Sequence, residues 1–364
     1  MEYVTPVIIM GGVSLFLSFV IIVAGRYLAE YGLCTITVND EKTLQLTGGE
    51  SLLSSLFTQK IFIPSACGGK GSCGYCKVKV VGGGGGLLPT ELPYLSPQER
   101  ENHVRLSCQV KVKNDLNILI PEEYLSIREY KAKVKKSRDL TYDIKEIRFQ
   151  LLLVDQPEFK FKPGQYIQFH VPNSKGEIIY RAYSISSLPS TPGEIELIVR
   201  LVPGGIGSTY IHNLKKGDEC LISGPYGEFF LDERSDADVI CVGGGAGMAP
   251  LKSIIYSLFH RKTKRKVYLY FGVRATKDLF YAEEFEALSR EHPNFHYVFA
   301  LSSPEETDEW EGETGFIHLV LDKHVEEGVQ KEAYLCGPPV MIDAVIKVLK
   351  EKGIDDDRIH YDKF

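Results

Sequence analysis

The sequence predicts a multidomain protein of mixed α+β and α/β class, with an N-terminal transmembrane helix ahead of three folded domains. An uncharged apolar stretch runs from Val7 to Ala24. Short β segments separated by Gly/Pro turns fill the middle of the chain, and strands alternate with helical segments from about residue 236 onward. We therefore expect a transmembrane anchor at 1–32, a small β-grasp domain at 33–125, an antiparallel β-barrel at 126–235 and a Rossmann-like domain at 236–364.

The apolar stretch is the basis for the predicted anchor. With its flanks it reaches the roughly 20 residues that a helix needs to cross a bilayer. A cleaved signal peptide is the alternative, but Glu2 is the only charge before the stretch and no persuasive cleavage site follows it. Arg26 is the first positive charge beyond it, which favours a single-pass anchor with the later domains in the cytoplasm.

The bulk composition is that of a folded protein without a nucleic-acid partner. Charged residues make up 25% of the 364 residues and hydrophobic residues 44%, so wholesale disorder is excluded. The net charge is −6, and no basic stripe with interleaved aromatics is present. The basic run from Arg261 to Lys266 is interpreted as a solvated helix end leading into a strand, with a site for anionic lipid or phosphate as the alternative.

Four cysteines form the strongest motif of the chain. Cys67, Cys73 and Cys76 follow the pattern C-x5-C-x2-C in a glycine-rich loop, and Cys108 follows in R-L-S-C. This pattern is close to the ferredoxin spacing for a [2Fe-2S] cluster, in which four thiolates hold two irons. Structural zinc and disulfides are the alternatives, but zinc sites usually have two C-x2-C pairs and the chain does not resemble a secreted protein. The motif predicts an electron-transfer protein.

The cysteine loop lies in the predicted small domain. Strands are expected at Thr35–Val38 and Thr43–Leu46, and a helix at Ser51–Gln59 packs against them. The five glycines Gly82–Gly86 are expected to form a flexible loop without chemistry. The remaining cysteines, Cys34, Cys220, Cys241 and Cys336, are scattered and fit free thiols on a reducing side of the membrane.

Two motifs in the barrel region are candidates for a flavin site. The predicted strands are Lys131–Lys135, Ile144–Leu152, Gln165–Val171, Glu194–Arg200 and Glu219–Ser223. In R-A-Y-S, Arg181 is able to pair with a phosphate, Tyr183 to stack on the flavin ring, and Ser184 to bond its reactive nitrogen edge. A plain strand end is the alternative for this tetrapeptide. The amides and hydroxyls of Gly207, Ser208 and Thr209 open a short helix and suit a pyrophosphate.

The last region has the layout of a dinucleotide-binding domain. Strands are expected at Val239–Val242, Val267–Phe271, Phe295–Ala300 and Tyr334–Cys336, and helices at Leu251–Phe259, Ala282–Glu291 and Val340–Lys350. The glycine loop after the first strand predicts phosphate contacts from Gly243, Gly244, Gly245, Gly247 and Pro250.

The glycine loop departs from G-x-G-x-x-G, because Met248 stands where the third glycine is usual, and a tight turn without ligand is the alternative. At the end of a later strand, Cys336, Gly337 and Pro338 are placed to meet the nicotinamide. A lone buried cysteine is the alternative for Cys336.

Together these motifs resemble a known family over nearly the whole chain. R-A-Y-S, S-G-P-Y-G-E-F-F, G-G-G-A-G-M-A-P and C-G-P-P are similar to the ferredoxin–NADP reductase superfamily. The order of the modules resembles the NADH-oxidising F subunits of sodium-translocating NADH:quinone oxidoreductases. Further matches are Leu87–Leu92, Arg105–Val110, Pro163–Gln168 and Thr314–His318.

The resemblance implies cofactors and a direction of electron flow. It implies FAD rather than FMN, bound through Arg181, Tyr183 and Ser184, NADH as the substrate, and a [2Fe-2S] cluster on the four cysteines. Hydride would pass from NADH to FAD, and electrons would leave through the cluster to integral membrane subunits and finally quinone, coupled to sodium transport in a bacterial inner membrane. The chemistry needs no general base, so Ser184, Cys336 and Phe364 would be positioning residues.

Two departures from the family accompany the resemblance. The link Phe169–Tyr180 is shorter than in the family, and the chain ends at Phe364, where the family has an aromatic near its C-terminus that covers the flavin. NAD is preferred over NADP by resemblance only, because Arg274 and Lys277 are able to hold a 2′-phosphate. A reductase that feeds an oxygenase or another membrane redox acceptor is the alternative function, against which the predicted anchor argues.

Overall fold

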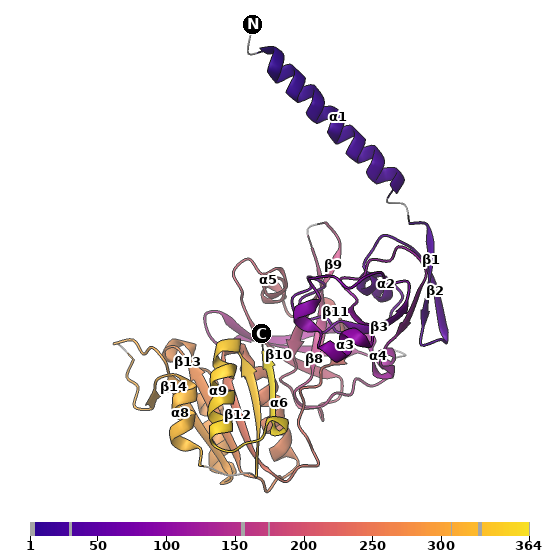
Figure 1. The fold of residues 1–364 in the computed structure, drawn as a ribbon. Coiled ribbons are helices and arrows are strands. Elements are labelled where there is room, and N and C mark those ends of the chain that lie inside the picture. The colour runs from indigo at the N-terminus through magenta and orange to yellow at the C-terminus, as the bar shows by residue number, and fades with distance from the viewer. Residues whose placement is uncertain are drawn as a thin grey trace. The chain divides into compact units, whose positions relative to one another are not determined.

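The computed structural model of the protein describes residues 4–28, 31–153, 157–173, 175–306, 308–326 and 330–363. The chain divides into two compact units, Met1–Ile127 and Arg128–Phe364. The first unit contains the long helix α1 and a small mixed sheet. The second contains an antiparallel sheet followed by a parallel one (Figure 1).

The sheet of the first unit confirms the predicted β-grasp arrangement. Its strand order, over the described residues, is β2-β1-β5-β3-β4, and β1 pairs with β2 antiparallel and with β5 in parallel. The strands are β1 (Leu33–Val38), β2 (Lys42–Thr47), β3 (Lys77–Gly82), β4 (Val104–Leu106) and β5 (Leu116–Leu119). The helices are α1 (Val4–Leu28), α2 (Leu52–Thr58), η1 (Leu92–Tyr94), α3 (Pro97–Glu101) and α4 (Glu122–Ser126).

Helix α2 shows how local sequence builds this domain. Ser51 caps it, since the Ser51 Oγ accepts a hydrogen bond from the Ser54 amide at 3.1 Å. Leu52 and Leu56 point from the helix into the core of the sheet and are fully buried there. This packed helix precedes the cysteine loop in the chain, and its packing fixes the position from which that loop begins.

The N-terminal helix matches the prediction in position. Helix α1 covers the uncharged stretch that predicted it. Within the part of the chain that the structure describes, however, no helix has the length and apolar character needed to span a membrane. The transmembrane part of the prediction is therefore not confirmed.

The antiparallel sheet of the second unit is a half-closed barrel. Its order among the described residues is β10-β7-β6-β11-β8-β9, and its two edge strands meet at one end through a bridge between Ile185 and Leu197. The elements are β6 (Arg128–Asp139), β7 (Ile144–Leu152), β8 (Tyr166–Pro172), β9 (Ile178–Ser184), β10 (Glu194–Arg200), α5 (Ile206–Asn213) and β11 (Glu219–Tyr226). The segment expected to be a short link, Phe169–Tyr180, is largely a hairpin, because β8 and β9 pair from Tyr166 to Pro172.

The parallel sheet confirms the Rossmann-like prediction. Its order in the described chain is β15-β14-β13-β12-β16-β17, and every neighbouring pair is parallel. The strands are β12 (Asp238–Gly244), β13 (Val267–Val273), β14 (Phe295–Leu301), β15 (Glu313–Thr314), β16 (Lys331–Gly337) and β17 (Ile359–Lys363). The helices are η2 (Gly245–Gly247), α6 (Met248–His260), η3 (Thr276–Asp278), α7 (Ala282–Glu291), α8 (Ile317–His324), α9 (Pro339–Glu351) and η4 (Asp356–Arg358).

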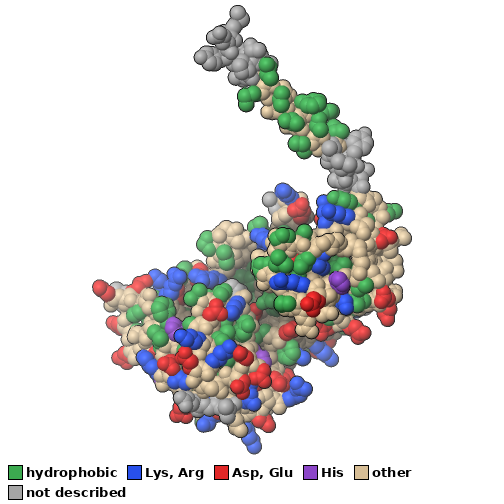
Figure 2. Space-filling model, viewed as in Figure 1, with side chains coloured by type: hydrophobic (Ala, Val, Ile, Leu, Met, Phe, Trp, Pro, Cys, Tyr) green, Lys and Arg blue, Asp and Glu red, His purple; other side chains and the backbone are tan. Residues whose placement is uncertain are grey.

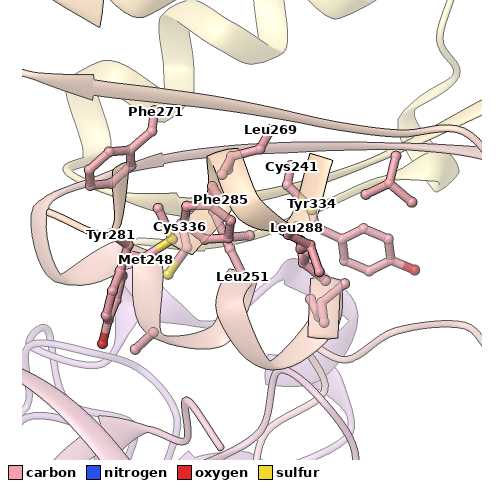
Figure 3. Packing of buried hydrophobic residues seen from close by; sticks show 14 of the residues in the cluster. Cys241, Met248, Leu251, Leu269, Phe271, Tyr281, Phe285, Leu288, Tyr334 and Cys336 are labelled. Atoms are coloured by element: carbon pink, nitrogen blue, oxygen red, sulfur yellow. The ribbon is translucent and has the colours of Figure 1, made fainter. Parts of the chain in front are cut away.

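Helix α6 packs on this sheet through a continuous apolar core (Figure 3). The basic run after it follows the helix end and leads into β13, as expected, but Arg265 is drawn inward and donates to the Ala237 carbonyl and to Glu332. This engagement leaves the solvated-helix-end interpretation in place for the rest of the run.

Candidate functional site

The four cysteines of the motif come together in two pairs. The Cys73 thiol donates to the Cys67 sulfur at 3.4 Å, and a second thiol–thiol hydrogen bond joins Cys76 to Cys108. The charge of Cys67 also acts on Cys108, so the two pairs belong to one site. None of the four forms a disulfide. Two sulfurs facing each of two irons is the distribution that a [2Fe-2S] cluster needs.

In each pair the electrostatics favour the thiolate, the form that binds metal, at one sulfur and the thiol at the other. The hydrogen bond from Cys73 lowers the pKa of Cys67 to about 4, although burial works in the opposite direction. The same bond raises the pKa of the Cys73 thiol far above its usual value. In the second pair, the hydrogen bond from Cys76 lowers the pKa of Cys108 to about 7. One sulfur of each pair is thus prepared to ionise first.

The zinc alternative needs a different arrangement of ligands from the two sulfur pairs. Among the residues that the structure describes, no three His, Cys, Asp or Glu side chains converge as ligands of a single ion. A structural zinc ion would need four ligands around one point. The support for a binuclear cluster is the pairing itself, Cys67 with Cys73 and Cys76 with Cys108.

The cysteine loop depends on glycine at a close approach. Gly74 lies between Cys73 and Cys76 with φ +73°, a backbone conformation that disfavours side chains. A Cβ added there would lie 2.9 Å from the ring of Tyr94. The loop can therefore turn against this ring only where residue 74 lacks a side chain.

A buried ion pair braces the loop beside the cysteines. The Glu91 carboxylate is fully buried and accepts from Arg105 Nη2 at 2.7 Å and from the Leu106 amide at 2.8 Å. Arg105 Nη1 also donates to the carbonyls of Gly84 and Gly85, at 3.1 and 3.0 Å. The Gly82–Gly86 loop, predicted to be flexible, thus has two of its carbonyls bound by this guanidinium.

The two flavin motifs meet in space. Gly207, in the first turn of α5, passes so close to β9 that an added Cβ would lie 2.7 Å from Arg181 Cγ and 2.8 Å from Tyr183 Oη. Arg181 Nη1 donates to the Tyr180 carbonyl at 2.7 Å, which orients the guanidinium. A helix start beside an arginine and a tyrosine is a cradle that suits a diphosphate and a flat ring.

The predicted residues of this cradle differ in what their side chains do. The Ser208 hydroxyl accepts from the Val202 amide at 3.0 Å and so holds its own loop. The Thr209 amide donates to the Gly205 carbonyl at 3.0 Å, and its side chain is exposed. Ser184 is half-buried at the end of β9, opposite Tyr166, and the pleat turns it to the face away from Tyr183.

The glycine loop of the parallel sheet is built by backbone contact. A Cβ added to Gly247 would lie 2.1 Å from the Cys336 carbonyl oxygen, and Gly243 pairs with Cys336 across β12 and β16. Gly245 has φ +57° and faces open space, and Gly244 lies beside Gly337 and Met341. The predicted residues of both strand ends thus gather at the carboxyl edge of the sheet, where such folds bind ligands.

The flanking residues of this edge are more deeply packed than predicted. Pro250 is buried in the first turn of α6. The Cys336 side chain is fully buried in the core near Met248 (Figure 3), and burial raises the pKa of its thiol well above the usual value. Pro338 caps α9, whose first residue follows it. The prediction for Phe364 lies outside the described residues.

The nicotinamide edge also bears on the choice between NAD and NADP. Lys277 forms an ion pair with Glu305, and the Thr276 hydroxyl donates to Asp308. The Glu305 carboxylate therefore already pairs with Lys277, one of the two basic residues able to hold a 2′-phosphate. Arg274, at the end of β13, is exposed.

Comparison with known proteins identifies the family. The family models for the 2Fe-2S iron-sulfur cluster binding domain, the oxidoreductase FAD-binding domain and the oxidoreductase NAD-binding domain match residues 36–113, 131–231 and 241–347. The F subunit of the Na(+)-translocating NADH-quinone reductase of Neisseria gonorrhoeae is 39% identical over 406 aligned positions that cover 100% of both chains. The chain belongs to this family of F subunits.

The cysteine pairs, the Gly207 cradle and the Gly247 approach fit the three groups that the family uses. The protein is an oxidoreductase of the NADH:quinone type that works with NADH, FAD and a [2Fe-2S] cluster. When bound, FAD accepts hydride from NADH and passes electrons to the cluster.

Solved structures match the fold over most of this chain. The cytochrome P450 reductase GcoB of Amycolatopsis is 29% identical with a TM-score of 0.72, and covers 91% of this chain and 98% of its own. The ferredoxin reductase in carbazole 1,9a-dioxygenase is 28% identical with a TM-score of 0.70 over the same shares. Both of these similar structures are named as reductases, one for cytochrome P450 and one in carbazole 1,9a-dioxygenase.

Sequence reasoning missed Glu91 and Arg105, which stand within quoted motifs without an assigned role, and the buried Lys252 on α6. The signal for the first pair was one acidic residue, Glu91, within the apolar motif Leu87–Leu92, and one basic residue, Arg105, at the start of the motif Arg105–Val110. Lys252 lies on a mostly buried helix face, and a charge at such a position was the signal for it.

Proposed function

We propose that the chain is the NADH-oxidising component of a sodium-translocating NADH:quinone oxidoreductase complex. Its cluster would pass electrons to integral membrane partner subunits and finally to quinone, and ion transport would take place in those partners. The observation that carries this proposal is the full-length match to relatives that are F subunits of such reductases, which includes the N-terminal segment as well as the three redox domains.

The site residues would share the work as follows. Cys67, Cys73, Cys76 and Cys108 would hold the cluster. Arg181 and the start of α5 would bind the FAD diphosphate, Tyr183 would support its ring, and Ser184 would contact the edge that receives hydride. The glycine loop Gly243–Gly247 and the end of β16 would hold the NADH diphosphate and place the nicotinamide.

Helix α1 would attach the chain to the complex at the bacterial inner membrane, with the redox domains in the cytoplasm. Its described side chains are largely apolar and exposed (Figure 2), with Leu15, Phe16 and Ile21 each more than half exposed. A surface of this size is costly in water, so a membrane or membrane-protein partner is expected to cover it.

The test is purification of the native complex through an affinity tag on this chain. Co-purification of integral membrane subunits, with NADH:quinone reductase activity that rises on addition of sodium, is the expected result. Activity that does not respond to sodium would remove the ion-coupling part of the proposal. A chain lacking residues 1–28 should reduce ferricyanide with NADH but no longer support quinone reduction in membranes.

A second candidate function comes from the solved structures. The layout is shared with reductases named for cytochrome P450 and carbazole 1,9a-dioxygenase systems. If the tagged chain instead co-purified with an oxygenase and supported its turnover with NADH, this alternative would replace the role in a quinone-reducing complex.

A further inference from the structure

A buried ionic network joins the dinucleotide-binding helix to the barrel. Lys252, in the second turn of α6, extends its ammonium group to two carboxylates on barrel strands. Its Nζ lies 2.7 Å from Glu196 on β10 and 3.4 Å from Glu146 on β7. The three residues are 3–7% exposed, so the charges face one another and not the solvent.

The network is hydrogen-bonded on every side. The Tyr281 hydroxyl donates to Glu146 at 2.6 Å and accepts from Lys252 at 3.3 Å. Arg138 donates to Glu146 at 2.9 Å, and Arg148 donates to Glu196 at 2.6 Å. Tyr281 is held at φ +62°, an uncommon conformation for a side chain of this size. The surrounding contacts therefore hold Tyr281 in this uncommon conformation.

Such a network is a poor source of stability for its size. Charges taken out of water lose hydration, and well-packed apolar residues often stabilise a fold as well or better. The best-attested use of buried ions is to specify one arrangement among several packed alternatives. Here the arrangement in question is that of α6 against β7 and β10.

The network lies close to the proposed sites of both redox groups. Lys252 comes five residues after Gly247, about 7.5 Å along the helix. On the barrel side, the Ser186 hydroxyl donates to Glu196 at 2.9 Å, two residues after Ser184. The Ser253 hydroxyl donates to the Ser187 carbonyl at 2.7 Å, which makes a second tie between the same segments.

A cavity of about 260 Å³ borders this contact and is lined by Lys252, Glu196, Ser187 and Tyr256 among others. It gives α6 room to shift and water room to enter if the ionic tie is lost. Apolar packing alone therefore does not fix α6 at this edge.

We propose that Lys252 is a positioning residue for hydride transfer. By binding Glu196 and Glu146, it holds the helix that follows the glycine loop against the strand that leads from Ser184, and so sets the distance between nicotinamide and flavin. This inference rests on the proposed assignment of the glycine loop and of Ser184. Its effect is expected on the reaction step rather than on affinity, because the Lys252 ammonium group binds barrel carboxylates and not a ligand.

The test compares three variants of the full-length chain. Lys252→Met keeps the side-chain length and removes the charge, and Lys252→Arg keeps the charge. Lys264→Met removes an exposed lysine of the same domain and is the matched control. The first-order rate of flavin reduction by NADH, the NADH dissociation constant and FAD content are measured anaerobically by stopped flow. Amide hydrogen exchange of residues 182–188 and 245–256 is measured without NADH.

Lys252→Met is expected to slow flavin reduction by about 10–100-fold, the range that a misplacement near 1 Å produces. Its NADH dissociation constant should change less than about 3-fold, and the primary deuterium isotope effect of [4-²H]NADH should rise as hydride transfer becomes limiting. Exchange should increase in both segments. Lys252→Arg should recover most of the rate, and Lys264→Met should match the parent.

The proposal is overturned if Lys252→Met reduces flavin at the parental rate, or if its defect is explained entirely by lost FAD or weaker NADH binding. If Lys252→Met does not fold, the double variant Lys252→Met/Glu196→Gln removes both members of the pair and is measured in the same way. A parent protein whose flavin NADH does not reduce would refute the proposed function itself, whatever the variants do.

Discussion

The cysteine loop of the first unit and the glycine loop of the second would hold their proposed ligands by opposite means. The cysteine loop presents four side chains, paired as Cys67 with Cys73 and Cys76 with Cys108. The glycine loop presents backbone, and its closest approach, from Gly247 to the Cys336 carbonyl, exists because a side chain is absent. One site therefore fails when side-chain atoms are taken away, and the other fails when they are added.

The two loops also share one structural feature. Each is steadied by a buried ion pair: Glu91 with Arg105 beside the cysteines, and Lys252 with Glu196 behind the glycine loop. The first pair lies within one domain and joins residues 14 apart in the sequence. The second joins residues 56 apart, on a helix and a barrel strand. The first is expected to act mainly on stability and the second mainly on geometry.

Removing one sulfur should give the largest effect. Cys76→Ser is expected to abolish the cluster, because a hydroxyl at a buried position replaces one of four thiolates. Iron content and the electron paramagnetic resonance signal of the reduced cluster should fall to background, while NADH still reduces the flavin. Cys220→Ser is the control, since Cys220 is a buried thiol of the barrel outside the motif. A cluster that survives in Cys76→Ser at full occupancy would disprove the ligand assignment.

Adding one methyl group to the glycine loop should give the second largest effect. Gly247→Ala places a Cβ 2.1 Å from the Cys336 carbonyl oxygen, so the start of α6 must move away from β16. NADH affinity is expected to fall about 100-fold through the misplaced loop amides. Titration of flavin reduction with NADH measures the change, and FAD content should stay at the parental level. Gly86→Ala, where an added Cβ meets open space, should have no effect on NADH binding. Equal NADH affinity in Gly247→Ala would show that this approach is not part of the site.

The contrast between the loops also explains what the sequence could predict. The cysteine spacing, the strand-then-glycine-then-helix order, and the R-A-Y-S and C-G-P-P strand ends are local patterns. A local pattern of this kind determines the local geometry of the chain, so the sequence predicts that the residues within each motif lie close together. The meeting of Gly207 with Arg181 and Tyr183 joins two such patterns and followed from the barrel that the intervening strands predict.

The misses depend on contacts between distant parts of the chain. The glycine content of Gly82–Gly86 predicted a flexible loop and gave no sign that Arg105, about 20 residues later, binds two of its carbonyls. Lys252 meets Glu146 across 106 residues, a pairing that no local periodicity reveals.

The ion pair beside the cysteines should stabilise the first unit. Glu91→Gln leaves the Arg105 charge buried without its partner, which is expected to cost about 3 kcal/mol. Thermal bleaching of the cluster absorbance should therefore occur at a temperature several degrees lower. Glu99→Gln is the matched control, since its partner Lys77 is 37% exposed and a glutamine still completes the Ser96 capping box. The control should cost less than about 1 kcal/mol. Similar losses in both variants would contradict a special contribution from the buried pair.

The pair behind the glycine loop should make a smaller, pH-dependent contribution. Burial alone would raise the pKa of Glu146, but hydrogen bonds from Arg138 and Tyr281 and the charge of Lys252 outweigh it and lower the pKa to about 2. The charged groups that face this carboxylate are Lys252 on α6, Arg138 on β6 and Arg148 on β7. Because its folded pKa lies below the ordinary 4.5, the ionised carboxylate stabilises the fold above pH 4.5.

This stabilisation should be lost as pH falls from about 4.5 toward 2, and its full value is at most about 3 kcal/mol. The difference in unfolding free energy between the parent and Glu146→Gln should therefore be constant above about pH 5 and shrink at lower pH. Urea unfolding followed by flavin fluorescence measures it in the second unit. A difference that stays constant down to pH 3 would mean that Glu146 titrates normally. Its role would then be limited to the geometry of α6, and Lys252 would position that helix without help from a strongly held carboxylate.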